Sequence, residues 1–320
     1  MSSRARGALV AIGAILVVAV VAGTALVLTR GSASSSRPPI VVAPAAQRFP
    51  NPPADAFVTA RADGADVLAL AVVPLARRIA VQVSDVTQNG VGASGLRVSF
   101  AVMTSKGGTG TRTATACGAG CYHASVPLGS RPLAVRVRVV RPGRVTSWKV
   151  ALPTTWPATD ASTILARATR TWKQLRSLSW SERLSSDATH TVLSDWRVVA
   201  PDRLSYRIRH EGQAVIVGPH RWDRQVGGGW VKSSALRLHQ PVPFWVSATD
   251  AHVIDSTTLR GHAVWRVSFF DPRTPGWFLV AIDRASYRTL DVRMTAAAHF
   301  MHDSYGGFNT SIKIVPPSSG

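Results

Sequence analysis

The feature that most constrains this chain is an unbroken apolar run near its N-terminus, from Ala8 to Leu28. An α-helix rises about 1.5 Å per residue, so this run would cover about 32 Å, close to the thickness of the hydrocarbon core of a bilayer. We therefore predict a transmembrane anchor over residues 1–30. The cytoplasmic membrane is the expected location, with a single pass.

The same run has a second interpretation, as a cleaved secretory signal. Arg4 and Arg6 supply the basic start of a signal, and Ser32-Ala33-Ser34 could serve as a cleavage site. The apolar stretch is longer than the 7–15 residues typical of signals, which favours the anchor. In both cases the N-terminus stays inside and the later residues lie outside the cytoplasm, because basic flanks tend to remain cytoplasmic.

The charge of the chain is strongly basic, with 37 Lys and Arg against 17 Asp and Glu, a net charge of +20. Attraction to anionic lipids or wall polymers is one interpretation. The other is that the charges are dispersed over solvated strand faces, and the alternation in Arg136-Val137-Arg138-Val139 favours it. Because export removes the chain from the cytoplasm, we expect no nucleic-acid partner.

Changes in composition divide the remaining chain. Residues 31–54 are rich in Pro, Ser and Ala and predict a stiff linker. Residues 55–153 contain short alternating segments separated by turn residues, which predicts an immunoglobulin-like β-sandwich. Pro153 and Pro157 then end this predicted domain.

Residues 158–316 predict an α+β domain. Asp160 is a candidate N-cap, and Ala161–Leu178 has apolar residues at helical spacing. The period then returns to two, so that Leu204, Tyr206 and Ile208 share one face, expected to face the helix, while Arg203, Arg207 and Arg209 lie outside. One helix and about ten antiparallel strands follow from this pattern. Ala235–Val246 contains Pro241 and Pro243 and predicts a lid or a short helix.

Three short segments resemble the bacterial lipoprotein carriers of the LolA/LppX kind. They are Val199-Ala200-Pro201-Asp202-Arg203-Leu204, Gly212 to Gly218, and Arg221-Trp222-Asp223. The resemblance implies a curved antiparallel half-barrel wrapped around a helix, with a hydrophobic cavity that accepts acyl chains. The predicted anchor and the additional sandwich distinguish this chain from freely shuttling carriers, so the resemblance does not imply transport across the envelope.

Two further resemblances concern neighbouring parts of the chain. Phe269-Phe270-Asp271-Pro272, Trp277-Phe278 and the stretch from Met294 to Met301 are similar to extracytoplasmic domains found with CopD-like copper-resistance membrane proteins. The preceding sandwich resembles the YtkA-like domain of the same setting. These resemblances imply a membrane-protein partner and a link to copper handling.

Aromatic and aliphatic side chains of the second domain are the candidates for a ligand cavity, since such cavities are mainly apolar. The candidate residues are Leu204, Tyr206, Ile208, Trp222, Trp230, Phe244, Trp245, Trp265, Phe269 and Phe278. Ordinary core packing between helix and sheet is the alternative for all of them.

Cysteine and histidine give two smaller candidates. Cys117 and Cys121 flank Gly118-Ala119-Gly120 and, in an exported protein, predict a disulfide across the tip of a hairpin rather than a redox or copper pair. His299, Met301 and His302 offer ligands that suit copper, but a strand would turn His302 away from the other two. We therefore expect no metal site and no cofactor.

Catalytic signatures such as Gly-x-Ser-x-Gly or His-Glu-x-x-His do not occur in the sequence, so we expect no enzyme activity. The sequence predicts a membrane-anchored, extracytoplasmic binding protein that holds a lipid or acyl chain. The alternative is a non-catalytic accessory or interaction protein of the cell envelope with a filled core.

Overall fold

The computed structural model describes residues 49–187, 189–236 and 241–318. The predicted anchor and most of the predicted linker therefore lie outside the described residues. Within these ranges, no helix has the length and apolar character needed to cross a bilayer.

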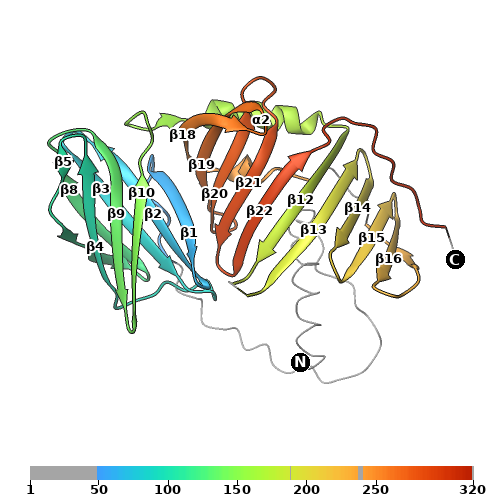
Figure 1. The fold of residues 1–320 in the computed structure, drawn as a ribbon, viewed down its shortest axis with the longest axis horizontal. Helices are drawn as coiled ribbons and strands as arrows, with labels where there is room; N and C mark the ends of the chain where they lie inside the picture. Colours follow the sequence, from blue (N-terminus) through green and yellow to red (C-terminus); the bar gives the residue numbers. More distant parts are fainter. Residues whose placement is uncertain (1–48, 188, 237–240, 319–320) are drawn as a thin grey trace.

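The first part of the described chain folds into two packed antiparallel sheets, drawn in blue to green in Figure 1. One sheet has the order β1 (Phe57–Asp63), β2 (Asp66–Leu75), β3 (Arg78–Val86), β8 (Cys121–Pro127) and β7 (Thr115–Gly118); the other has the order β10 (Arg144–Ala151), β9 (Pro132–Arg141), β4 (Arg97–Thr104) and β5 (Gly107–Gly108), with β6 (Arg112–Thr113) on β4. Alternate apolar residues of both sheets, such as Val81 and Phe100, fill the space between them. We call this part the sandwich; its immunoglobulin-like type stays a prediction.

The second part forms one open antiparallel sheet of 12 strands. Its order is β11 (Thr159–Asp160), β18 (Thr249–Leu259), β19 (His262–Asp271), β20 (Gly276–Asp283), β21 (Thr289–Ala296), β22 (His299–Gly306), β12 (Ser177–Ser185), β13 (Thr191–Val199), β14 (Arg203–Ile208), β15 (Gly212–Val217), β16 (His220–Gln225) and β17 (Val231–Ser234). The first long strand of this part pairs with the last, β12 with β22, in the middle of the sheet. The prediction of a mainly β chain with one α-helix in its second half is confirmed for the described residues.

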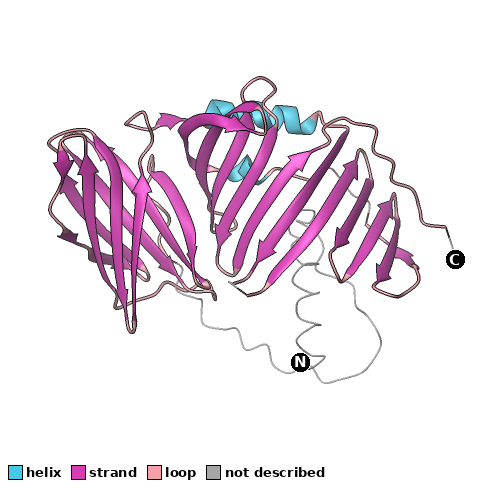
Figure 2. Ribbon diagram, in the orientation of Figure 1, coloured by secondary structure: helices cyan, strands magenta, loops and turns pink. Residues whose placement is uncertain are grey.

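The helix α2 (Ser162–Lys173) packs against one face of this sheet, which we call the helix face (Figure 2). Leu165, Ala168 and Trp172 are its buried residues. It is shorter than predicted, because the chain enters β12 at Ser177. The predicted N-cap is shifted as well: Ala161 holds that position, while the carboxylate of Asp160 accepts a hydrogen bond from the backbone N–H of Ser162 at 3.2 Å.

The helix face is divided into two apolar clusters. Under α2, side chains from β19 to β22 and β12 form the larger cluster. Beyond the helix, Leu204 belongs to a second cluster with Trp196, Val198 and Ile216. The register places Leu204, Tyr206 and Ile208 on the helix face, as predicted. Their strand does not contribute to the cluster under α2, and Leu204 instead belongs to the second cluster.

The sandwich packs directly on the large sheet. Phe270 and Trp277, at the ends of β19 and β20, form one buried cluster with Val58 and Val67 of the sandwich, and Phe49 stacks on Trp277 with ring centroids 5.4 Å apart. Both large-sheet residues are almost fully buried, at 0% and 3% exposed. This contact joins the two parts through an apolar junction.

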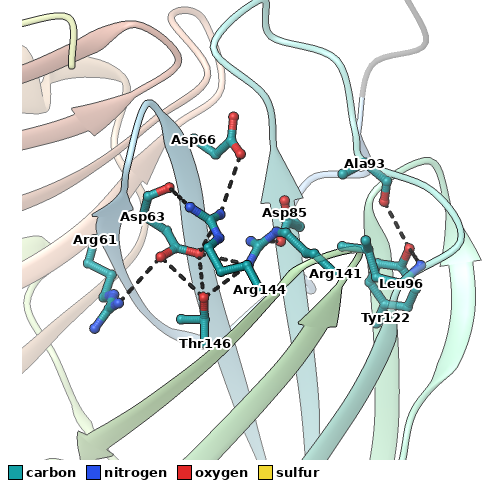
Figure 3. A network of polar contacts seen from close by, with 10 residues as sticks. All are labelled: Arg61, Asp63, Asp66, Asp85, Ala93, Leu96, Tyr122, Arg141, Arg144 and Thr146. Carbon is teal, nitrogen blue, oxygen red and sulfur yellow. Dashed lines mark hydrogen bonds and ion pairs between the residues drawn. The ribbon is translucent and has the colours of Figure 1, made fainter. Parts of the chain in front are cut away.

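A charged network links the two sheets at one end of the sandwich, by the β1–β2 and β9–β10 turns (Figure 3). Arg141 Nη1 lies 2.8 Å from Asp63 Oδ2, and Arg141 Nη2 is paired with Asp85. Arg144 and Thr146 also donate hydrogen bonds to Asp63, at 3.2 and 3.0 Å. Burial raises the pKa of Asp85 to about 6, although the positive charge of Arg141 acts in the opposite direction.

The predicted disulfide between Cys117 and Cys121 is confirmed, with the two Cα atoms 5.0 Å apart. Gly118 pairs directly with Cys121, so the turn consists of Ala119 and Gly120 rather than three residues. Gly120 has a φ of +65°, in the left-handed region that glycine adopts most easily.

Candidate functional site

The candidate site is a pocket on the helix face of the large sheet, between the sheet, α2 and the segment Pro241–Trp245. This segment leads into the short 3₁₀-helix η1 (Phe244–Ser247), so the predicted lid or short helix at Ala235–Val246 corresponds to it in part. The lining residues come from distant parts of the chain. They are Trp172, Trp180, Glu182, Trp196, Leu204, Pro241, Val242, Pro243, Phe244, Trp245, Met301, Asp303 and Tyr305.

Aromatic rings form most of the pocket wall. Trp180 and Trp196 stack with centroids 5.4 Å apart and planes 5° from parallel. Trp172 meets Trp245 edge-on at 5.6 Å and Tyr305 edge-on at 5.5 Å. Because the rings stand at different angles, they present both faces and edges to the space between them.

Among the described residues that line the pocket, two have acidic side chains and the other 11 are uncharged. Glu182 of β12 and Asp303 of β22 are directly opposite in the register of the two strands and lie on the helix face. Asp303 is 1% exposed, whereas Glu182 keeps partial contact with solvent. Two like charges opposite each other on neighbouring strands are destabilising, so this pair needs an explanation.

The hydrogen bonds around the two carboxyl groups are few. Tyr305 donates its hydroxyl to Asp303 Oδ2 at 2.7 Å, and Asp303 Oδ1 has no partner. Ser194 Oγ lies 3.5 Å from Glu182 Oε1 and itself accepts a hydrogen bond from Trp196 Nε1 at 2.7 Å. Among the described residues, neither carboxyl group forms an ion pair, and a buried carboxylate without a partner is costly.

The surroundings shift the pKa of each acidic group upward. Burial raises the pKa of Glu182 to about 7, against hydrogen bonds from Ser194 and Trp180. Burial, followed by the charge of Glu182, raises the pKa of Asp303 well above its usual value. The hydroxyl of Tyr305 also has a raised pKa, through burial and the neighbouring Asp303. The pocket therefore holds protons at neutral pH that exposed carboxyl groups would release.

Two indole hydrogen bonds hold the segment over the pocket. Trp172 Nε1 donates to the carbonyl of Pro241 at 2.7 Å, and Trp245 Nε1 donates to Thr169 Oγ1 of α2 at 2.9 Å. The cavity beneath this segment has a volume of about 40 Å³, which is room for a few waters. A larger ligand has to displace this segment outward, and Val242 at 57% exposure already lies on its outer side.

Three of the ten residues predicted for the cavity line this pocket, namely Leu204, Phe244 and Trp245. Phe269 and Phe278 lie in the core behind it, where Phe278 stacks on Phe269 at 4.9 Å and on Phe244 at 5.7 Å. These five residues are thus close together.

The other five predicted residues do not line the pocket. Four of them have an Arg or Lys of the chain itself over their rings: Tyr206 with Arg221, Trp222 with Lys232, Trp230 with Arg224, and Trp265 with Arg284. Ile208 is partly exposed at the end of β14. The strand pattern placed Leu204, Tyr206 and Ile208 on one face but could not show where the pocket ends.

The alternative metal ligands are separated by the strand they share. His302 is hydrogen-bonded through Nε2 to Asp291 at 2.7 Å, and His299 Nδ1 lies 3.0 Å from the carbonyl oxygen of Ala297. Met301 belongs instead to the pocket lining. Within residues 49–187, 189–236 and 241–318, no group of three or more His, Cys, Asp or Glu side chains is placed to hold a metal ion.

Sequence reasoning missed the two carboxyl groups, although a signal for them exists. In β12 the alternating residues Leu178, Trp180, Glu182 and Leu184 place one acid in an otherwise apolar series. In β22 the series is Met301, Asp303 and Tyr305. An acidic residue in the apolar register of a strand indicates a buried charge, and two of them on paired strands indicate a site.

Comparisons with known proteins give similarity in structure only. No family model and no curated protein sequence matches the chain. The chain is similar to LprF from Mycobacterium bovis, with 12% identity, a TM-score of 0.39, and coverage of 50% of this chain and 97% of that one. It is also similar to a LolA superfamily protein from Nitrosomonas europaea, with 10% identity, a TM-score of 0.23, and coverage of 50% of this chain and 96% of that one. A DUF1329 family protein from Desulfovibrio piger has 5% identity, a TM-score of 0.27, and coverage of 49% of this chain and 95% of that one. At these scores the likeness carries no functional argument, and the function is argued from the pocket.

Proposed function

We propose that this chain is a non-catalytic binding protein that holds a ligand with an apolar body in the pocket under Pro241–Trp245. The observation that carries the proposal is the pocket lining itself, in which 11 of 13 described residues are uncharged and six are aromatic. Such surfaces are typical of sites for small hydrophobic molecules, in which a few polar groups fix the orientation. A lipid or single acyl chain is the class of ligand that fits best.

The position of the pocket supports a binding role over a purely structural one. The larger core under α2 is formed by buried apolar side chains, whereas the pocket lies near the helix end, where Trp172 and the segment Pro241–Trp245 cover the sheet. Two indole hydrogen bonds hold that segment, and a ligand can replace such contacts at modest cost because each is worth about 0.5–1.5 kcal/mol.

We further propose that the protein acts outside the cytoplasm, held to the membrane by residues 8–28. The disulfide between Cys117 and Cys121 supports an oxidising compartment. Sequencing of the N-terminus of the mature protein tests the anchor: a start at Met1 or Ser2 is expected, and a start near Ser34 would show a cleaved signal instead.

Photo-crosslinking tests the binding role. The full chain in lipid nanodiscs is incubated with dodecanol that carries a diazirine in its chain, irradiated, and digested. We expect crosslinks in the peptides that contain β12, β22 and residues 241–245. The variant Leu204→Trp fills the pocket and should lose most of these crosslinks, at an overpacking cost of about 1–3 kcal/mol.

Leu193→Trp is the matched control, because Leu193 is 37% exposed on β13, the strand next to β14, and does not line the pocket. It should crosslink like the wild type. Absence of pocket crosslinks in the wild type, or an equal loss in both variants, contradicts the binding role.

A further inference from the structure

The aromatic rings of this protein fall into two groups according to whether a cation lies over them. Seven rings have an Arg or Lys within 6.0 Å of the centroid, as for Trp222, Trp230 and Trp265. In the described chain, no such cation is found over Trp180, Trp196, Trp245 or Tyr305 in the pocket. With 37 Lys and Arg in the sequence, cations are abundant and yet are kept away from these rings.

The same separation holds for the carboxyl groups. Glu182 and Asp303 share the pocket with these rings, and within residues 49–187, 189–236 and 241–318 no Lys, Arg or His lines it. Asp303 is 1% exposed and its Oδ1 has no hydrogen-bond partner. Carboxyl groups among aromatic faces are the combination that recognises quaternary ammonium ions, because both the ring quadrupole and the carboxylate attract a cation.

We propose that the pocket selects ligands whose apolar chain ends in a positively charged nitrogen, with Asp303 and Glu182 as the groups that bind the cation. This inference rests on the proposed function, since it specifies the head group of the same ligand. The ammonium group lies between the two carboxyl groups and the rings of Trp180 and Tyr305, and the alkyl chain extends toward Leu204 and the segment Pro241–Trp245.

A bound cation supplies a compensating charge that the described lining residues do not provide. Burial and mutual repulsion hold protons on the two carboxyl groups, and a bound ammonium replaces a proton as the compensating charge. The net charge of +20 repels a cation at long range, but at physiological salt this effect is screened beyond about 8 Å. The local site and the overall charge therefore predict opposite ligand preferences, which an experiment can separate.

Three probes with the same diazirine-bearing dodecyl chain make the test: a trimethylammonium, a hydroxyl and a carboxylate head group. Each is crosslinked to the full chain in nanodiscs, for the wild type, Asp303→Asn and Glu182→Gln. For each probe, the ratio of pocket crosslinking in wild type to that in a variant cancels differences in bilayer partition. We expect this ratio to be about tenfold or more for the ammonium probe and within twofold for the other two.

Asp195→Asn is the matched control, because Asp195 lies next to β12 on β13 but is 47% exposed and bonded to Ser181 outside the pocket. It should leave all three ratios near one. Arg237 and His239 lie outside the described residues, so a variant with both replaced by Ala tests whether a cation of the chain itself fills the site. We expect ammonium crosslinking in that variant to equal or exceed the wild type.

The outcomes separate the inference from the function on which it rests. Equal ratios for the three head groups, or a preference for the hydroxyl or carboxylate probe, overturn the cation selectivity while the binding role stands. Loss of ammonium crosslinking in the Arg237 and His239 variant also overturns it. Absence of pocket crosslinks with every probe contradicts the binding role itself.

Discussion

The protein contains two buried acidic pairs that the fold treats in opposite ways. In the sandwich, Asp63 and Asp85 share Arg141, and Arg144 and Thr146 complete the contacts of Asp63 (Figure 3). In the large sheet, Glu182 and Asp303 face each other without a cation among the described residues.

We interpret the compensated pair in the sandwich as part of the fold, and the uncompensated pair in the pocket as part of a ligand site. A buried ion pair is costly to make, but removing one partner leaves the other charge uncompensated. In the sandwich, Arg141 provides the compensating charge for both acids. In the pocket, no described cation compensates Glu182 and Asp303, and such local conflicts with stability are typical of functional sites.

The largest expected effect comes from removing the cation of the sandwich. Arg141→Ala leaves Asp63 and Asp85 buried with only partial compensation, and the Arg141 side chain is itself only 10% exposed. We expect the free energy of unfolding to fall by about 3–5 kcal/mol, measured by urea denaturation at pH 7.5. Arg144→Ala is the control, because its side chain is 42% exposed and should cost at most about 1 kcal/mol. Similar losses for both variants would show that Arg141 does not serve as the buried counter-charge.

The second prediction compares one acid from each pair, replaced by its amide at pH 8. Asp63→Asn weakens the contacts with Arg141 and Arg144 and should destabilise the protein by about 1.5–3 kcal/mol. Asp303→Asn removes a buried carboxyl group that must keep its proton in the folded state at pH 8, whereas the unfolded chain releases it, and should stabilise the protein by about 1–2 kcal/mol. The measurement is the midpoint of urea unfolding for each variant, converted with a common slope. If both variants change the free energy of unfolding in the same direction, the two acidic pairs do not differ in the way proposed.

The strand pattern was sufficient for the architecture but not for the boundaries within it. Period-two alternation correctly predicted the strands around Leu204 and Val280, and the residues with helical spacing correctly predicted α2. The helix end was predicted five residues too late, since Leu175 and Leu178 continue an apolar spacing although the chain has already turned into β12. The spacing of apolar residues along the chain does not show at which residue tertiary packing terminates a helix or strand.

The pocket could be predicted only in part because its lining depends on which strands become neighbours. Phe244 and Trp245 were found from their aromatic character and from the prolines beside them. Glu182 and Asp303 become a pair only because β12 and β22, at opposite ends of this part of the chain, are adjacent in the sheet. The alternation within each strand places each acid in an apolar series, but only the paired register shows that the two acids lie opposite each other.

The smallest expected effect is a difference in pH dependence between the two pairs. A carboxyl group with a raised pKa in the folded state holds its proton when the unfolded chain has released it. The free energy of unfolding therefore falls as pH rises from the unfolded pKa through the folded one. With a folded pKa of about 7, Glu182 contributes a fall on the order of 1 kcal/mol between pH 6 and 8; with a folded pKa of about 6, Asp85 contributes a smaller fall over the same range.

Replacing Glu182 by Gln tests this directly, because the titratable groups that face it are few. Asp303 and Tyr305 face it from β22, and Asp291 acts on Asp303 from β21, whereas the lining residues from α2, β13, β14 and the segment Pro241–Trp245 are uncharged. Urea unfolding at pH 6, 7 and 8 should show a flatter profile in Glu182→Gln than in the wild type, by an amount on the order of 1 kcal/mol over the range. Asp195→Asn should keep the wild-type slope. A Glu182→Gln profile as steep as that of the wild type would mean that this carboxyl group is already ionised at pH 6 and that a cation of the chain compensates it, as Arg141 does for the acids of the sandwich.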